Sequence, residues 1–136
     1  MADQRRPRGL LDTSVIIDLE RLDPADLPIE SAISAITMAE LAAGPHATHD
    51  PVERARRQDR LQRAEAAFDP LPFDSEASRA YGRVYAAVVA AGRKARGARA
   101  VDLLLAATAC SVGLPLYTRN PDDFRALNDL VEVVSV

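Results

Sequence analysis

Short apolar segments alternate with longer segments whose apolar residues recur every three or four positions, and this alternation predicts strands that are followed by helices. The predicted strands are short and mostly apolar, and they cover residues 9–11, 31–36, 114–117 and 131–136. A further extended segment with two prolines is predicted over residues 68–73. The predicted helices are longer on average, and they cover residues 13–22, 37–43, 51–68, 75–91, 101–112 and 121–127.

Strands that alternate with helices usually form a parallel sheet, because each helix returns the chain to the edge where the next strand begins. We therefore expect a three-layer α/β/α sandwich with a central, mostly parallel sheet of four to five strands. The chain has 136 residues, no internal repeat and no linker long enough to divide it, so a single domain over residues 1–136 is expected. Hydrophobic residues make up 48% of the sequence, which is enough for a core at this length.

The overall charge limits how the protein could contact nucleic acid. A formal net charge of −3 excludes the global positive field of a non-specific nucleic-acid-binding protein, so any such contact needs a local basic patch, a metal ion or both. The single cysteine, Cys110, cannot form an internal disulfide, which is typical of a cytoplasmic protein. The first apolar segment is interrupted by Asp12 and Asp18, so neither a signal peptide nor a membrane span is expected.

Four acidic residues stand where a predicted strand ends or where the following helix begins: Asp12, Glu40, Asp102 and Asp123. Each one has a structural explanation when it is considered alone. Asp12 is a suitable cap for the helix after it, and Glu40 completes a capping-box pattern that begins at Thr37. Asp102 and Asp123 suit the first turn of a helix, where the helix dipole favours negative charge.

The four acids together indicate more than four separate caps. In a parallel sheet the carboxyl ends of the strands lie on one edge, where α/β folds bind ligands, and carboxylates gathered there repel one another. A bound cation removes this repulsion, and oxygen ligands without a nearby Cys or His favour Mg²⁺ or Mn²⁺ over Zn²⁺. Such an ion activates water and neutralises charge on a phosphodiester, so the pattern predicts phosphodiester hydrolysis.

Two groups of basic residues are distinguished by their surroundings. The loop predicted over residues 92–100 carries four of them next to Asp102, and we expect them to contact RNA phosphates, with an exposed loop that binds nothing as the alternative: Arg93, Lys94, Arg96 and Arg99. The arginines of the 51–68 helix are interleaved with acids. Glu53 and Arg57, and likewise Asp59 and Arg63, are four residues apart, which predicts ion pairs on an exposed face.

Four segments, in order and spanning nearly the whole chain, match the pattern of a known family: residues 10–17, 34–44, 102–109 and 113–124. Through them the chain resembles the VapC toxins of bacterial VapBC toxin–antitoxin pairs, which are PIN-domain proteins. The resemblance implies a PIN-like fold and a Mg²⁺- or Mn²⁺-dependent endoribonuclease that cuts cellular RNA and inhibits translation and growth. It also implies a VapB-type antitoxin as partner, a homodimer and a toxin–antitoxin hetero-oligomer, without any association with a membrane.

The resemblance also implies roles for the site residues. Asp12, Glu40 and Asp102 match the first three acids of the family, and Asp12 and Asp102 match its usual metal-binding pair. Asp123 is the preferred candidate for the fourth acid, which would bind metal or position water. Four neighbouring polar residues are candidates for support of these acids: Thr13, Ser14, Asn120 and Asp122.

Two other functions remain as alternatives at this stage. One is a catalytically silent PIN-like module that only binds a protein or nucleic-acid partner. The other is a phosphatase that works through an aspartyl-phosphate. The phosphatase is disfavoured because its strand usually carries Asp-x-Asp, whereas Asp12 is followed by Thr13 and Ser14.

Overall fold

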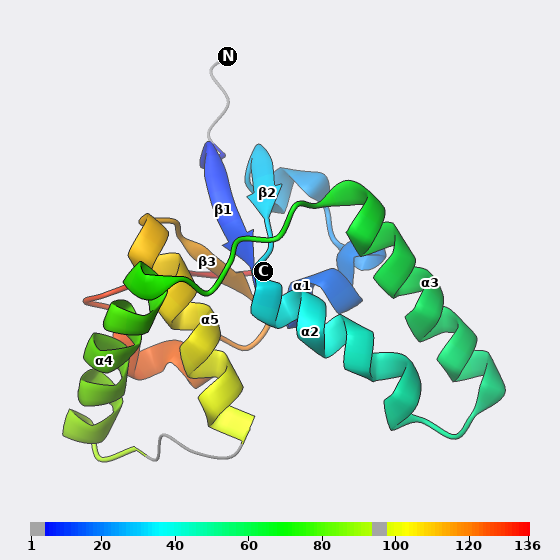
Figure 1. Ribbon diagram of the computed structural model, residues 1–136. Helices are drawn as coiled ribbons and strands as arrows, with labels where there is room; N and C mark the ends of the chain where they lie inside the picture. The colour runs from blue at the N-terminus through cyan, green and yellow to red at the C-terminus, as the bar shows by residue number, and fades with distance from the viewer. Residues whose placement is uncertain (1–4, 94–97) are drawn as a thin grey trace.

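The structure is a computed structural model that describes residues 5–93 and 98–136, and it has a central parallel sheet with helices on both sides (Figure 1). The strands are β1 (Arg8–Leu11), β2 (Glu30–Ala32), β3 (Leu116–Thr118) and β4 (Val133–Ser135). Their order in the sheet is β2-β1-β3-β4, and each neighbouring pair is parallel. The predicted fold class is therefore confirmed, with four strands in the described part of the chain.

The α-helices in the described ranges are α1 (Thr13–Ile17), α2 (Ala35–Ala43), α3 (Pro51–Ala67), α4 (Ser75–Ala90) and α5 (Ala98–Val112). Short 3₁₀ helices connect them, and these are η1 (Leu19–Arg21), η2 (Pro24–Asp26), η3 (Gly44–Ala47) and η4 (Pro121–Leu127). Within the described residues, every helix is too short or too polar to cross a membrane.

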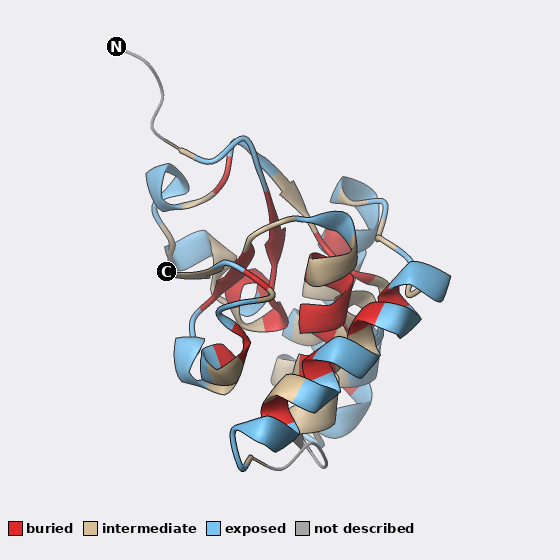
Figure 2. Cartoon of the chain, turned by 90° about the vertical axis from the view of Figure 1, so that its left-hand side faces the viewer, coloured by how far each residue is buried: buried red, intermediate tan, exposed pale blue. Residues whose placement is uncertain are grey.

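Two hydrophobic cores lie on opposite faces of the sheet because side chains alternate along its strands. Leu10 and Leu116 belong to the core that α4, α5 and η4 cover. Leu11 and Tyr117 belong to the core that α1, α2 and α3 cover. Figure 2 shows the buried residues along the strands and on one side of the helices in front of them. This arrangement makes the three layers of the sandwich.

Several boundaries differ from those that the sequence predicts, three of them by three residues or more. The helix expected over residues 13–22 ends at Ile17, because Asp18 leaves the helical conformation and η1 follows as a separate turn. The strand expected over residues 31–36 ends at Ala32, because Ser34 is already the N-cap of α2. The helix expected from residue 101 begins at Ala98, which shortens the predicted basic loop.

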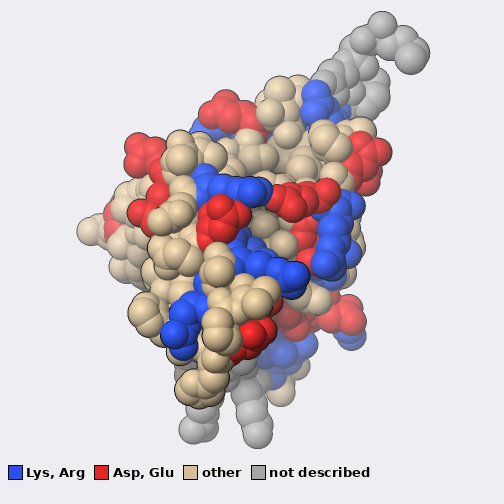
Figure 3. Space-filling model, turned by 90° about the vertical axis from the view of Figure 1, so that its right-hand side faces the viewer, with Lys and Arg blue, Asp and Glu red and all other residues tan. Residues whose placement is uncertain are grey.

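The exposed helix α3 carries the mixed charges that its sequence predicts (Figure 3). The Nε atom of Arg57 lies 3.1 Å from Oε1 of Glu53, and the Nε atom of Arg63 lies 3.0 Å from Oδ2 of Asp59. Both predicted ion pairs are therefore confirmed. These two arginines are therefore paired with acids of their own helix.

Gly9 allows β1 to pass close to the ring of Tyr117, which is 2% exposed. A Cβ atom at Gly9 would lie 2.5 Å from Cε1 of Tyr117. We expect Gly9→Ala to lower the free energy of unfolding by about 1–3 kcal/mol, because the buried ring has to move. Gly82 in α4 has no atom within 4 Å of such a Cβ, so Gly82→Ala provides the control. It should raise the stability by about 0.5–1 kcal/mol. Equal urea midpoints for the two variants would contradict this packing.

Candidate active site

Asp12 follows directly after β1, and its carboxylate is almost completely buried at 6% exposure. The hydroxyl of Ser14 donates to Oδ2 of Asp12 at 2.9 Å, and the hydroxyl of Thr118 donates to the same oxygen at 2.8 Å. Although Asp12 occupies the N-cap position of α1, its side chain makes no capping hydrogen bond. The capping interpretation is therefore wrong for this carboxylate, whose hydroxyl donors come from α1 and from the end of β3.

The register of the sheet brings Thr118 to Asp12. Leu11 in β1 is paired with Tyr117 in β3, so the next residues of the two strands are neighbours. The amide of Asp12 donates to the carbonyl of Tyr117 at 2.8 Å. The hydroxyl of Thr118 also accepts a hydrogen bond from the amide of Asn120 at 3.0 Å. Thr118 thus fixes the buried carboxylate and the turn after β3 together.

Glu40 lies inside α2, and it does not close a capping box. The N-cap of α2 is Ser34, whose hydroxyl accepts from the amide of Thr37 at 3.0 Å. Glu40 is too far along the helix to reach that cap, and its Oε1 instead accepts from the hydroxyl of Thr13 at 2.6 Å. Because Thr13 is the residue after Asp12, this bond draws Glu40 towards the end of β1.

Asp102 lies on α5, beyond the first turn, because the helix begins at Ala98. The expectation that this acid sits at a helix start is wrong, so the helix dipole does not explain it. Burial and the negative charges of the three other acids, Asp123 first, raise the pKa of Asp102 to about 6, while Arg99 lowers it. The charges of the three other predicted acids therefore all act on Asp102 at this edge of the sheet.

The two neighbouring acids of η4 have different surroundings. Asp122 is exposed and forms an ion pair with Arg125 at 2.9 Å. Asp123 is half-buried, and its charge is the largest electrostatic contribution to the raised pKa of Asp102. This difference favours Asp123 over Asp122 as the fourth acid. Asn120 is the N-cap of η4, but its side chain makes no capping hydrogen bond, so its contribution is the amide that holds Thr118.

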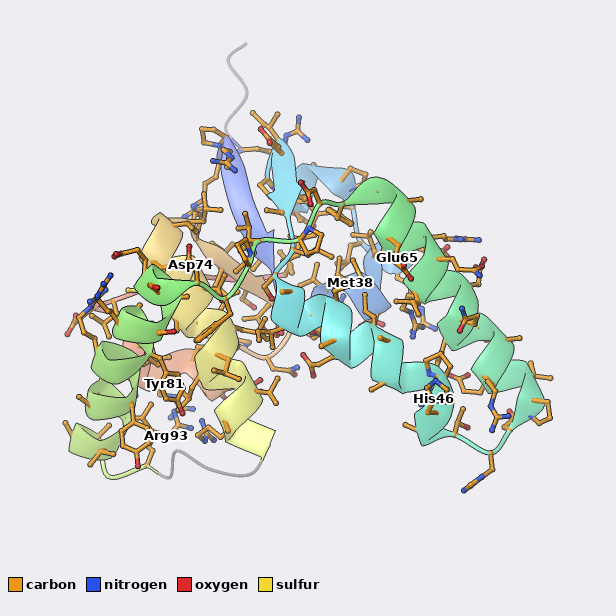
Figure 4. All side chains as sticks on the ribbon, in the orientation of Figure 1. Met38, His46, Glu65, Asp74, Tyr81 and Arg93 are labelled. Carbon is orange, nitrogen blue, oxygen red and sulfur yellow. The ribbon has the colours of Figure 1, made fainter. Side chains whose placement is uncertain are left out.

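Two of the four predicted RNA-binding residues contact the turn that carries Asp123. Arg93, at the end of α4 in Figure 4, donates to the carbonyl of Asp122 at 3.2 Å. Arg99 on α5 donates to the carbonyl of Asp123 at 3.1 Å. Each arginine retains further N–H groups that these bonds do not use. Lys94 and Arg96 lie outside the described residues.

The four acids offer only oxygen atoms to a ligand, which suits a hard divalent cation. Among the described residues, none of the four has an ion-pair partner, although one of them is nearly buried. Within the same ranges, no three His, Cys, Asp or Glu side chains already stand in an arrangement that could hold a metal ion. The donor set therefore fits Mg²⁺ or Mn²⁺ chemically.

Known proteins resemble this chain over most of its length. Residues 9–130 match the PIN domain family. Ribonuclease VapC5 of Mycobacterium tuberculosis is 38% identical over 133 residues, which cover 94% of this chain and 95% of that protein. The chain belongs to the VapC group of the PIN-domain family. Ribonuclease VapC8 of the same organism is 40% identical over 102 residues, which cover 74% of this chain and 89% of that protein.

The solved structures that resemble this VapC-type chain include members of toxin–antitoxin systems. The structure of VapBC-5 from Mycobacterium tuberculosis has a TM-score of 0.84 and 37% sequence identity, covering 96% of this chain and 99% of that one. FitAcB from Neisseria gonorrhoeae has a TM-score of 0.69 and 26% identity, covering 93% and 96% of the two chains. The likeness extends over the full sandwich and is not confined to the acidic edge.

Two threonines, Thr118 and Thr37, contact the acids of this VapC-type site or their supports, although neither is predicted from the sequence to be a site residue. The sequence places the hydroxyl residue Thr118 at the end of a predicted strand, but its contact with Asp12 depends on which strands are neighbours in the sheet. Thr37 stands three residues before Glu40 in the sequence, and this spacing is typical of a capping box at the start of a helix. Its hydroxyl instead lies 3.0 Å from that of Thr13.

Proposed function

We propose that this chain is the toxin of a toxin–antitoxin pair and acts as a Mg²⁺- or Mn²⁺-dependent endoribonuclease on cellular RNA. The observation that carries the proposal is the gathering of four carboxylates, one of them nearly buried, without an ion-pair partner in the described residues. RNA as the substrate is supported by relatives that are named ribonuclease VapC. Inhibition of translation and growth would follow from cleavage of that RNA.

The proposed roles follow from where each acid is held. Asp12 and Asp102 would hold the metal, which would supply charge neutralisation at the phosphodiester and lower the pKa of a water molecule. Glu40 or Asp123 positions the attacking water and accepts its proton. Ser14 and Thr118 keep Asp12 in place, and Thr13 keeps Glu40 in place.

The proposal also includes partners. Similar solved structures contain VapBC pairs, which supports a VapB-type antitoxin as the partner of this chain. We expect the toxin to form a homodimer, to assemble with the antitoxin into a hetero-oligomer, and to be located in the cytoplasm. RNA phosphates would contact the four basic residues that precede Asp102 in the sequence: Arg93, Lys94, Arg96 and Arg99. Of these, Arg93 and Arg99 retain N–H groups beyond those that bind the carbonyls of η4.

Brief induction of the chain in bacteria, followed by mapping of RNA 5′ ends, tests the proposed function. Wild-type protein should arrest growth and create new 5′ ends at a small set of sites. Asp12→Asn should produce neither, at the same level of folded protein. New ends that are identical in both samples would contradict the proposal, and so would growth arrest without any new ends, as expected for a silent binding module.

Asp123→Asn and Asp122→Asn form a matched pair that tests the choice of the fourth acid. We expect Asp123→Asn to lower the rate of RNA cleavage by about 100-fold, as for loss of a group that positions or deprotonates water. In the metal-free protein it should also lower the pKa of Asp102, because it removes the largest charge that raises it. Asp122→Asn removes only an exposed ion pair, so both quantities should stay near the wild-type values. Cleavage kinetics and carboxyl ¹³C NMR provide the measurements, and the reverse ranking would assign the role to Asp122.

A further inference from the structure

Thr37 is completely buried in α2, and its hydroxyl oxygen lies 3.0 Å from that of Thr13. Thr13 is itself 9% exposed, and its hydroxyl lies 2.6 Å from Oε1 of Glu40. The three side chains form a single line from the interior of the protein to the acidic edge. In the described residues, Thr13 is the only hydrogen-bond partner of the Thr37 hydroxyl.

The donor and the acceptor in each of these two hydrogen bonds can be assigned. A threonine hydroxyl has one proton to donate, and an ionised carboxylate can only accept. The short contact between Thr13 and Glu40 is typical of a hydroxyl that donates to a charged oxygen. Since the proton of Thr13 is committed to Glu40, the hydroxyl of Thr37 has to donate to Thr13.

The behaviour of Thr37 differs from that of a comparable buried threonine. Thr108 in α5 is 1% exposed, and its hydroxyl donates to the carbonyl of Leu104, one turn earlier in the same helix. This local bond is common for threonine in helices. Thr37 lies in the first turn of α2, three residues after the N-cap Ser34, so no earlier turn of its own helix offers it a carbonyl. Its hydroxyl is directed to another element, α1.

We infer that Thr37 is a positioning residue for Glu40 and acts through the hydroxyl of Thr13, an inference that rests on the proposed function. Glu40 is an exposed residue with a long side chain, and its free carboxylate would sample several rotamers in water. Thr13 can also rotate, so one hydroxyl alone does not fix the direction of its bond. A donor behind Thr13 fixes that rotation and strengthens its bond to Glu40. Because Thr13 follows Asp12 in the chain, the hydrogen bonds from Thr37 through Thr13 to Glu40 fix the position of Glu40 relative to Asp12.

Thr37→Val tests this inference because valine has nearly the same shape and lacks only the hydroxyl donor. We expect Thr37→Val to lower kcat for RNA cleavage by about three- to tenfold, the usual effect of one hydrogen bond, with little change in KM. Thr37→Ser should restore most of the rate. Thr108→Val is the matched control, because it removes an equally buried helical hydroxyl away from the acids, and its kcat should stay at the wild-type level.

A double-mutant cycle separates positioning from a general loss of stability. In a Glu40→Ala background, Thr37→Val should have no further effect on kcat, because the residue through which it acts is gone. An equal loss of kcat in Thr37→Val and Thr108→Val would overturn the inference. An equal loss from Thr37→Val with and without Glu40 would overturn it as well.

Crystal structures of the metal-free wild type and of Thr37→Val give a second readout that needs no RNA. The contact between Thr13 and Glu40 should be present in the wild type and lost or displaced in Thr37→Val. An unchanged Glu40 side chain in the variant would overturn the inference. If the wild-type protein cleaves no RNA, the proposed function is wrong, and the position of Glu40 in these crystals decides the role of Thr37 by itself.

Discussion

Asp102→Asn is expected to abolish metal-dependent RNA cleavage and to make the metal-free protein more stable at neutral pH. The loss of activity follows from the removal of one member of the proposed metal-binding pair, and it should exceed about 1000-fold. The gain in stability has a separate origin. Burial and the charges of Asp123, Asp12 and Glu40 raise the pKa of Asp102 from 3.8 to about 6, so its ionised form is unfavourable in the folded state.

The sign of this stability effect depends on pH. Between about pH 4 and pH 6 the folded protein retains a proton that the unfolded chain has already released, so stability falls as the pH rises through this range. Above pH 6 the full free-energy cost of ionising Asp102 in the folded state is present. Asparagine removes it, which should stabilise the protein at pH 7.5 by about 1–2 kcal/mol, since water screens part of the charge on a half-buried group. At pH 4 the variant should show little or no gain.

Urea denaturation of the metal-free proteins at pH 4 and pH 7.5, together with a cleavage assay, checks both parts of this prediction. Asp122→Asn is the control, because that exposed acid is paired with Arg125 and its removal should have the same small effect at both pH values. A loss of stability in Asp102→Asn at pH 7.5 would contradict the electrostatic account. A well-folded Asp102→Asn protein that still cuts RNA with Mg²⁺ would contradict the metal account.

Metal addition is expected to stabilise the wild-type protein strongly at pH 7.5 and weakly at pH 5. A ligand at one hundred times its Kd stabilises the folded state by about 2.7 kcal/mol. Because Asp102 has a pKa of about 6 without metal, an ion has to displace its proton at pH 5, whereas the carboxylate is already free at pH 7.5. The effect should disappear when EDTA is added in excess.

Thermal unfolding with and without Mg²⁺ or Mn²⁺ at the two pH values provides the measurement for this second prediction. Asp12→Asn should abolish the metal-dependent increase in Tm, because it removes the nearly buried carboxylate of the pair. Asp122→Asn should keep the increase. Equal shifts at pH 5 and pH 7.5, or the same shift in Asp12→Asn as in the wild type, would place the metal somewhere other than at these acids.

The sequence predicts the layers of this fold because its apolar residues follow two simple periods. Leu10 and Leu11 face opposite cores, as expected for adjacent residues of a strand covered on both sides. The pattern does not contain the order of the strands, since that order depends on packing between distant segments. For this reason the contact of Thr118 with Asp12 could not be predicted from the chain alone.

The helix starts were the least predictable part of the site. Thr37 and Glu40 have the spacing of a capping box, but the N-cap of α2 is Ser34, three residues before Thr37. Tertiary structure selects Ser34, because the chain after β2 still has to pair with Leu71 before α2 begins, through the bond from the amide of Leu71 to the carbonyl of Ile33. Glu40 therefore does not cap the helix, and its side chain can contribute to the group of acids at the edge of the sheet.

The combination of four acids, together with the resemblance to VapC toxins, identified residues that local rules would have treated as caps. Asp102 shows the difference most clearly, because it lies in the interior of a helix that does not follow a strand. Neither a strand end nor a first turn marks it. Its importance depends on charges brought from three distant parts of the chain, and only the folded structure reveals how they raise its pKa.

Cleavage of RNA by the purified protein under controlled metal conditions tests the central claim most directly. The wild-type protein should cut at defined sites with Mg²⁺ or Mn²⁺, stop when excess EDTA is added, and resume when Mg²⁺ exceeds the chelator. Asp12→Asn should remain inactive under all three conditions, while Asp122→Asn should follow the wild type. Cleavage that continues in EDTA, or that Asp12→Asn carries out at the wild-type rate, would contradict a metal-dependent ribonuclease centred on these four acids.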